Sequence, residues 1–115
     1  MKYAVILLGL SLGWAMSAHA GDAEAGKTLA AVCGACHGAD GNSMAPFPKL
    51  AGQGEKYLLK QLVDIRDGAR SVPTMAGQLT GKSDQNLADI AAYYASQTAS
   101  GGSTKPELLE LGEKI

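Results

Sequence analysis

The sequence contains few of the residues that usually build a core or a metal site. Cysteine and histidine each occur twice, and aromatic residues make up only 5% of the 115 residues. Small domains bury a smaller fraction of their surface than large ones, so a chain with so little aromatic volume usually needs a disulfide or a buried cofactor as well. Charge is nearly balanced, at −1 overall with both signs interspersed, which gives no reason to expect nucleic acid as a partner.

The N-terminus has the pattern of an export signal. A short basic start is followed by an apolar run from Tyr3 to Trp14, and Ala18-His19-Ala20 matches the small-x-small cleavage pattern. The run is shorter than the ~20 residues that span a bilayer. We therefore expect residues 1–20 to be a signal peptide, with an uncleaved N-terminal anchor as the alternative. Cleavage after Ala20 leaves nine Lys and Arg against eleven Asp and Glu, and His37 as the only histidine.

No stretch alternates apolar and polar residues for long enough to predict a strand. Three segments have helical spacing instead: Ala23–Val32 with Asp22 as N-cap, Glu55–Asp67 with Gly68 as its stop, and a third helix that Ser83 caps and that runs to about Gln97. The connecting segments 38–54 and 69–82 are rich in Gly and Pro, which break regular structure. The predicted class is all-α with long loops.

The C-terminal region is expected to lie outside this domain. Residues 99–106 have the Gly and Ser content of a flexible linker, and residues 107–115 have the composition of a further helix. The stretch that begins at Glu110 repeats the pattern E-apolar-G-x-x-aliphatic of the stretch that begins at Glu24. Either a second, related domain starts here or a tail helix matches by chance.

Both cysteines lie in one pentapeptide, Cys33-Gly-Ala-Cys36-His37. A redox pair would need the motif at a helix N-terminus within a βαβ unit, whereas here a helix precedes it. A structural zinc site needs four ligands, and only three sulfur or imidazole ligands remain after export. Covalent haem attachment explains both the residue types and their order, because the thiols of Cys33 and Cys36 form thioethers and His37 binds iron.

A haem bound through His37 has one further axial position. Met75 follows 38 residues later in a loop long enough to reach the opposite face, and a thioether there raises the reduction potential. A methionine that fills a gap in the core is the alternative for Met75. Met44 is the competing ligand, but it lies close to Pro46 and Pro48, so it would need a strained path.

Pro48 lies eleven residues after His37. Its carbonyl oxygen could accept the Nδ1 proton of His37 and so fix the tautomer that presents Nε2 to iron. A simple turn proline is the alternative.

Four stretches, CGACHGADGNS, PKLAGQGEKYLLKQL, DGAR and LADIAAYYASQ, together resemble the class I c-type cytochromes, and most closely the cytochrome c4 family. The resemblance covers residues 21–98 almost continuously. It implies the class I cytochrome c fold, in which three main helices and long loops surround one covalently bound haem c. It also implies a periplasmic location.

The resemblance assigns roles residue by residue. Cys33 and Cys36 would carry the thioethers, His37 and Met75 would be the axial ligands, and Pro48 would orient the histidine. Arg70 would lie near the haem propionates; taken alone, it would be a solvated surface charge. Gly26 would form a close helix crossing with Tyr93 or Tyr94. Cytochromes c4 resemble two such domains in tandem, so residues 107–115 would begin a second haem domain that this chain lacks.

The function expected from these features is one-electron transfer, not catalysis. Two axial ligands leave no iron position open to a substrate. The family implies a place in a respiratory chain, between a quinol-oxidising cytochrome complex and a terminal oxidase or reductase, with peripheral membrane association. The alternatives are a sensor or peroxidase-type enzyme with an open iron site, and a haem subunit of a larger oxidoreductase.

Overall fold

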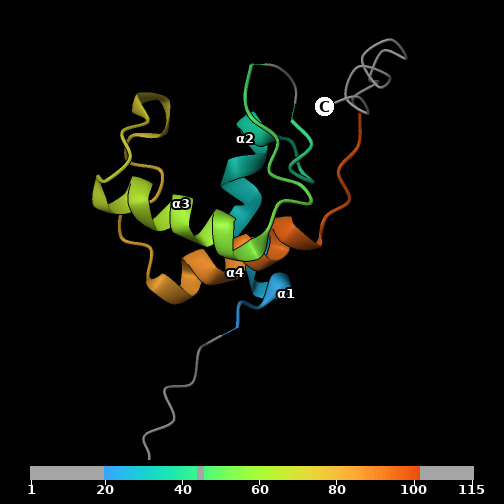
Figure 1. Cartoon of the computed structure of the whole chain (residues 1–115), viewed down its shortest axis with the longest axis horizontal. Coiled ribbons are helices and arrows are strands. Elements are labelled where there is room, and N and C mark those ends of the chain that lie inside the picture. The colour runs from blue at the N-terminus through green and yellow to red at the C-terminus, as the bar shows by residue number, and fades with distance from the viewer. Residues whose placement is uncertain (1–19, 44–45, 102–115) are drawn as a thin grey trace, which may run out of the picture.

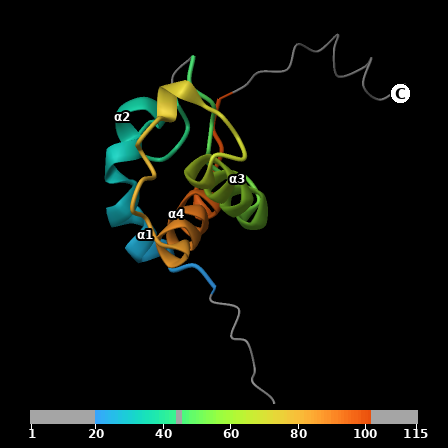
Figure 2. The same ribbon diagram turned by 90° about the vertical axis from the view of Figure 1, so that its left-hand side faces the viewer.

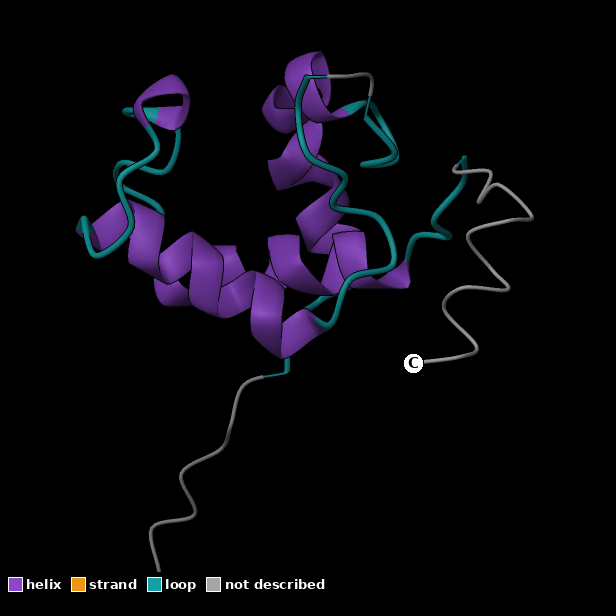
Figure 3. Ribbon diagram, turned by 45° about the horizontal axis from the view of Figure 1, so that its top comes forward, coloured by secondary structure: helices purple, strands orange, loops and turns teal. Residues whose placement is uncertain are grey.

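The computed structural model describes residues 20–43 and 46–101 of the chain. Three predicted features fall outside these residues: the signal sequence except for Ala20, Met44, and the further helix at 107–115. All regular elements of the described residues are helical, as Figure 3 shows, and the prediction of an all-α class is confirmed. None of the described helices has both the length and the hydropathy that crossing a bilayer requires.

The first helical segment is a column of three short elements. Helix α1 (Ala23–Leu29) is followed by the 3₁₀ helix η1 (Ala30–Cys33) and then by α2 (Gly34–His37), as Figure 2 shows. One continuous helix over Ala23–Val32 was expected. The difference arises because the chain tightens after Leu29, where the amide of Gly34 bonds to the carbonyl of Ala31, three residues back.

The other two main helices match their predicted positions. Helix α3 (Glu55–Asp67) ends at Gly68, whose φ of 85° is the left-handed conformation that favours glycine at this cap position. Helix α4 (Asp84–Ser96) begins with a capping box, in which Ser83 and Asn86 each accept a hydrogen bond from the other's backbone amide. The loop between α3 and α4 contains the short 3₁₀ helix η2 (Pro73–Met75).

Helix α4 is the centre of the core. It packs against α1 on one side and α3 on the other, and residues 87–94 are all buried. The crossing with α1 is close because Gly26 has no side chain: a Cβ there would lie 1.9 Å from the carbonyl oxygen of Asp89 and 2.9 Å from Cβ of Tyr93. Of the two tyrosines expected at this crossing, the structure selects Tyr93.

A buried carboxylate also joins these two helices. Asp89 on α4 is only 6% exposed, and its Oδ1 accepts hydrogen bonds from the backbone amide of Asp22, at 2.8 Å, and from Nε2 of Gln85, at 2.7 Å. A buried polar group costs free energy unless it is hydrogen-bonded, so these contacts fix where the start of α1 meets α4.

The candidate haem site

A cavity of about 340 Å³ lies between three segments: η1 with α2, α3, and the loop that contains η2. Its volume is within the range of roughly 300–1,000 Å³ typical of small-molecule and cofactor sites. In Figure 1, α2 and the loop with η2 stand apart from each other on the same side of α3. Residues of all three segments line the cavity, so α2 and the η2 loop form two separate walls of one site.

Every residue predicted for haem attachment or iron ligation lines this cavity. Cys33, Cys36 and His37 come from one wall, and Met75 comes from the η2 loop. The remaining two residues of the predicted site, Pro48 and Arg70, line it as well. The fold therefore brings together side chains that lie up to 42 positions apart in the sequence.

The ring of His37 is held from two directions. Its Nδ1 lies 2.9 Å from the carbonyl oxygen of Pro48, and its ring lies 6.2 Å from the ring of Phe47. A carbonyl oxygen can only accept, so Nδ1 is the nitrogen that carries the proton and Nε2 keeps its lone pair. His37 itself is 7% exposed.

The loop that carries Pro48 is fixed against α4. The amides of Leu50 and Ala51 both bond to the carbonyl of Gly41, and the amide of Gly52 bonds to the carbonyl of Tyr94. Gly41 has a φ of 78°, and a Cβ there would lie 2.6 Å from the ring of Tyr94. Contacts to α4 thus determine where the Pro48 carbonyl meets the histidine.

Tyr94 is a cavity residue that sequence reasoning did not place there. Its hydroxyl is buried and has no hydrogen-bond partner among the described residues. Burial raises the pKa of this hydroxyl, and the neighbouring Cys33 thiol adds to the effect, although the two groups are not in hydrogen-bond geometry. An unpartnered buried donor beside an apolar cavity is expected where a polar ligand completes the site. In the sequence, the only feature that could have indicated this position is the pair of adjacent tyrosines in the stretch AYYAS.

The two cysteines are free and differ in environment. Cys36 is exposed, whereas Cys33 is partly buried, and burial raises the pKa of its thiol. Both line the cavity, one helical turn apart. This set of side chains fits a covalently attached haem: two thiols, an imidazole, a thioether, and a buried hydroxyl that has no partner among the described residues.

Comparison with known proteins agrees with this geometry. The family model described as "Cytochrome c" matches residues 23–98. The chain belongs to the cytochrome c family. Within this family of c-type cytochromes it is close to cytochrome c4: it is 62% identical to the cytochrome c4 of Pseudomonas aeruginosa over all of this chain and 58% of that protein.

A solved structure of the same kind of cytochrome has a similar fold. The reduced cytochrome c4 from Pseudomonas stutzeri matches with a TM-score of 0.75 and 59% identity, over 83% of this chain and 55% of that one. A shorter relative, cytochrome c-554(548) of Halomonas halodenitrificans, is 46% identical over 68% of this chain and 99% of its own length. Compared with the cytochromes c4, whose lengths it covers to 58% and 55%, this chain spans little more than half of the relatives that it matches.

These matches confirm the cytochrome c fold and the cofactor. Cytochromes of this family bind haem c through thioether bonds, and one haem per chain fits a domain with a single Cys-x-x-Cys-His motif. The predictions of a class I c-type cytochrome and of one covalently attached haem c are confirmed.

Proposed function

We propose that this chain is a periplasmic one-electron carrier in which His37 and Met75 are the two axial ligands of haem iron. The observation that supports this most directly is the placement of both side chains in the walls of one cavity that the cysteine pair also lines. Iron with two protein ligands has no open position for a substrate, so we infer a carrier and not an enzyme. Bound haem supplies the one-electron redox chemistry.

His37 is prepared for this role by its partner. The Pro48 carbonyl accepts the Nδ1 proton at 2.9 Å, which fixes the tautomer and makes Nε2 the better donor to a metal. Met75 has its backbone fixed by a hydrogen bond from its amide to the carbonyl of Val72, at 2.9 Å. Held with haem in this cavity, the Met75 thioether would favour ferrous iron and so would raise the reduction potential.

Arg70 is proposed to bind a haem propionate. Its Nη1 donates to Oε1 of Gln61 at 2.7 Å, and both side chains line the cavity. A guanidinium has five donors, so this contact leaves others available for a carboxylate. The Gln61 contact ties the exposed Arg70 side chain to α3 at the edge of the cavity.

Electron transfer requires that a partner approach the cofactor. Val32, Phe47 and Tyr57 are the exposed large apolar side chains of the described residues, at 63%, 38% and 55% exposure, and all three line the cavity. All three belong to the lining of the haem site, and bound haem would cover part of their surface. We propose that redox partners dock beside this site, where the cofactor comes nearest to the surface: a quinol-oxidising cytochrome complex and a terminal oxidase or reductase, for a protein at the membrane periphery.

A second candidate is the electron acceptor or haem subunit of a dehydrogenase. It is favoured by relatives named as a thiosulfate dehydrogenase electron acceptor in Thiomonas intermedia, 41% identical, and a cytochrome subunit of sulfide dehydrogenase in Chlorobaculum tepidum, 32% identical. The greater length of the cytochromes c4 supports a second haem domain in the whole protein. Export with cleavage after Ala20 remains part of this proposal.

The absorption spectrum of the oxidised holoprotein tests the ligand pair. We expect a weak far-red charge-transfer band, which indicates methionine sulfur on ferric haem, and no binding of carbon monoxide by the reduced protein. A missing band together with carbon monoxide binding would instead support the alternative hypothesis, a sensor or peroxidase-type enzyme with an open iron site.

Covalent attachment is tested with cysteine variants. We expect wild-type protein to keep its haem on a denaturing gel, and Cys33→Ser or Cys36→Ser to keep it through the one remaining thioether. The double variant should lose its haem completely on denaturation. Haem that stays with the double variant would show that another residue forms the bond.

A further inference from the structure

Met75 lies in a loop, residues 68–83, that has few ties to the rest of the protein. Most of its backbone hydrogen bonds are internal: the amides of Met75, Ala76, Gln78, Thr80 and Lys82 each bond to a carbonyl three residues earlier in the loop. At its start, the amide of Arg70 bonds to the carbonyl of Asp64 on α3. In the second half of the loop, only its last residue, Ser83, has a backbone bond to a helix among the described residues: its carbonyl accepts from the amide of Leu87 on α4, at 3.1 Å.

Little packing restrains the middle of this loop. Gly77 and Gly81 both have positive φ, at 80° and 76°, and no atom lies within 4 Å of where their Cβ would be. Leu79, which is buried in the core, and Met75, which is partly buried and packs against it, are the exceptions. Segments with few contacts open locally at a lower free-energy cost than the whole domain unfolds.

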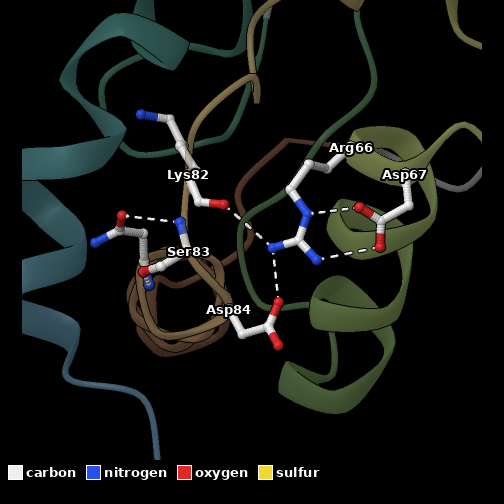
Figure 4. A network of polar contacts seen from close by, with 6 residues as sticks. Arg66, Asp67, Lys82, Ser83 and Asp84 are labelled. Carbon is white, nitrogen blue, oxygen red and sulfur yellow. Dashed lines mark hydrogen bonds and ion pairs between the residues drawn. The ribbon is translucent and has the colours of Figure 1, made fainter.

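Arg66 supplies the tie that the backbone does not. It lies near the end of α3, and its side chain is 19% exposed. Its Nε and Nη2 donate to the two carboxylate oxygens of Asp67, at 2.8 and 3.1 Å. Its Nη1 reaches across to the carbonyl oxygen of Lys82, at 3.1 Å, and to Oδ1 of Asp84 on α4, at 2.7 Å. Figure 4 shows the guanidinium between these groups.

These contacts close the loop at its base. Asp67 immediately precedes the loop, Lys82 lies at its end, and Asp84 begins the next helix. The planar guanidinium forms two parallel bonds to one carboxylate, and its third nitrogen contacts two further acceptors. Together these contacts hold it in one orientation. Holding the two ends of a 16-residue loop together removes conformations in which the loop swings away from the cavity.

We propose that Arg66 is a positioning residue that keeps Met75 at the cavity by tying the two ends of the 68–83 loop together. This role rests on the proposed ligation of iron by Met75. Arg66 itself does not line the haem cavity, so it acts through the loop. Asp67 and Asp84 are its partners in the network, and Lys82 contributes its carbonyl oxygen whatever its side chain.

The test is the binding of exogenous imidazole to the ferric holoprotein. Imidazole must displace Met75, so its apparent affinity increases as the loop opens more often. We expect Arg66→Gln to raise the imidazole affinity about tenfold, because it removes the charge and the bidentate contact. Arg66→Lys keeps the charge without the planar fork and should give an intermediate value.

Lys60→Gln is the matched control. Lys60 also pairs with an aspartate on α3, Asp64, at 2.6 Å, but this pair lies within the helix and does not reach the loop end. We expect its imidazole affinity to equal that of wild type. Should Arg66→Gln impair folding, Asp84→Asn removes the charge from the contact to α4 and leaves the other Arg66 contacts in place. Asp84 is 86% exposed, so only a twofold to threefold increase in imidazole affinity is expected there.

Hydrogen exchange separates positioning from general destabilisation. In Arg66→Gln, the loop amides of Met75, Ala76 and Gln78 should exchange faster by the same factor as imidazole binding increases, while the buried α4 amides change less. An imidazole affinity in Arg66→Gln equal to that of Lys60→Gln, with the far-red band present in wild type, would overturn this role. A wild-type protein without the band would instead overturn Met75 ligation itself.

Discussion

Met75→Ala is expected to abolish the far-red charge-transfer band of the ferric protein and to lower the reduction potential by on the order of 0.1–0.3 V, part of the roughly 0.8 V that axial ligands control. This follows from the proposed ligation of iron by Met75, which lines the cavity from a different segment than His37. If Met75 is the ligand, removing its thioether leaves that iron position open, so the reduced variant should also bind carbon monoxide. Absorption spectra and a redox titration measure all three effects.

Met44→Ala is the matched control for this substitution. It removes the only other methionine that follows the predicted cleavage site. The band and the potential should both stay at their wild-type values. If Met44→Ala removes the band and Met75→Ala does not, the axial ligand has been assigned to the wrong methionine and Met75 packs as an ordinary core side chain.

Gly26→Ala is expected to lower the free energy of unfolding by about 3 kcal/mol, which is a large part of the stability of a small domain. The added Cβ would lie 1.9 Å from the carbonyl oxygen of Asp89. Backbone cannot rotate out of the way as a side chain can, so α1 must move off α4. Thermal unfolding of the reduced holoprotein, followed by far-ultraviolet circular dichroism, should show a decrease in Tm of more than about 10 °C.

Gly54→Ala provides the comparison for this effect. Gly54 precedes α3 with a φ of −59°, which any residue adopts, and the nearest atom to an added Cβ lies 3.9 Å away. Its free energy of unfolding should change by less than about 1 kcal/mol. Equal stabilities for Gly26→Ala and Gly54→Ala would mean that the helix crossing adjusts without cost.

The close crossing and the haem site depend on each other through α4. Tyr93 packs against Gly26, while the next residue, Tyr94, packs against Gly41 and lines the cavity. The hydroxyl of Tyr93 also donates to the carbonyl oxygen of Ala39, at 2.8 Å, just after the haem-binding motif. A shift of α1 at Gly26 would therefore displace the turn of α4 that carries Tyr93 and Tyr94, and through it the haem site.

Local sequence features are enough to predict the class of the fold and the chemistry of the motif. Helical spacing, the N-caps Asp22 and Ser83 and the stop at Gly68 are local features, so α3 and α4 could be predicted to within a residue or two. The Cys-x-x-Cys-His motif is local as well. Its residue types and order allowed covalent haem to be distinguished from zinc and from a redox pair without any structure.

How these local pieces meet depends on the packing of the folded chain. That packing puts Tyr93, not Tyr94, at the helix crossing. It also leaves the Tyr94 hydroxyl at the cavity without a partner among the described residues, and it makes Arg66 the link between the two ends of the Met75 loop. Arg66 appears in the sequence as an ordinary charge near the end of a helix, and its partners Lys82 and Asp84 lie at least 16 positions away. Such contacts depend on where the chain turns back on itself, and no periodicity within a single segment contains that information.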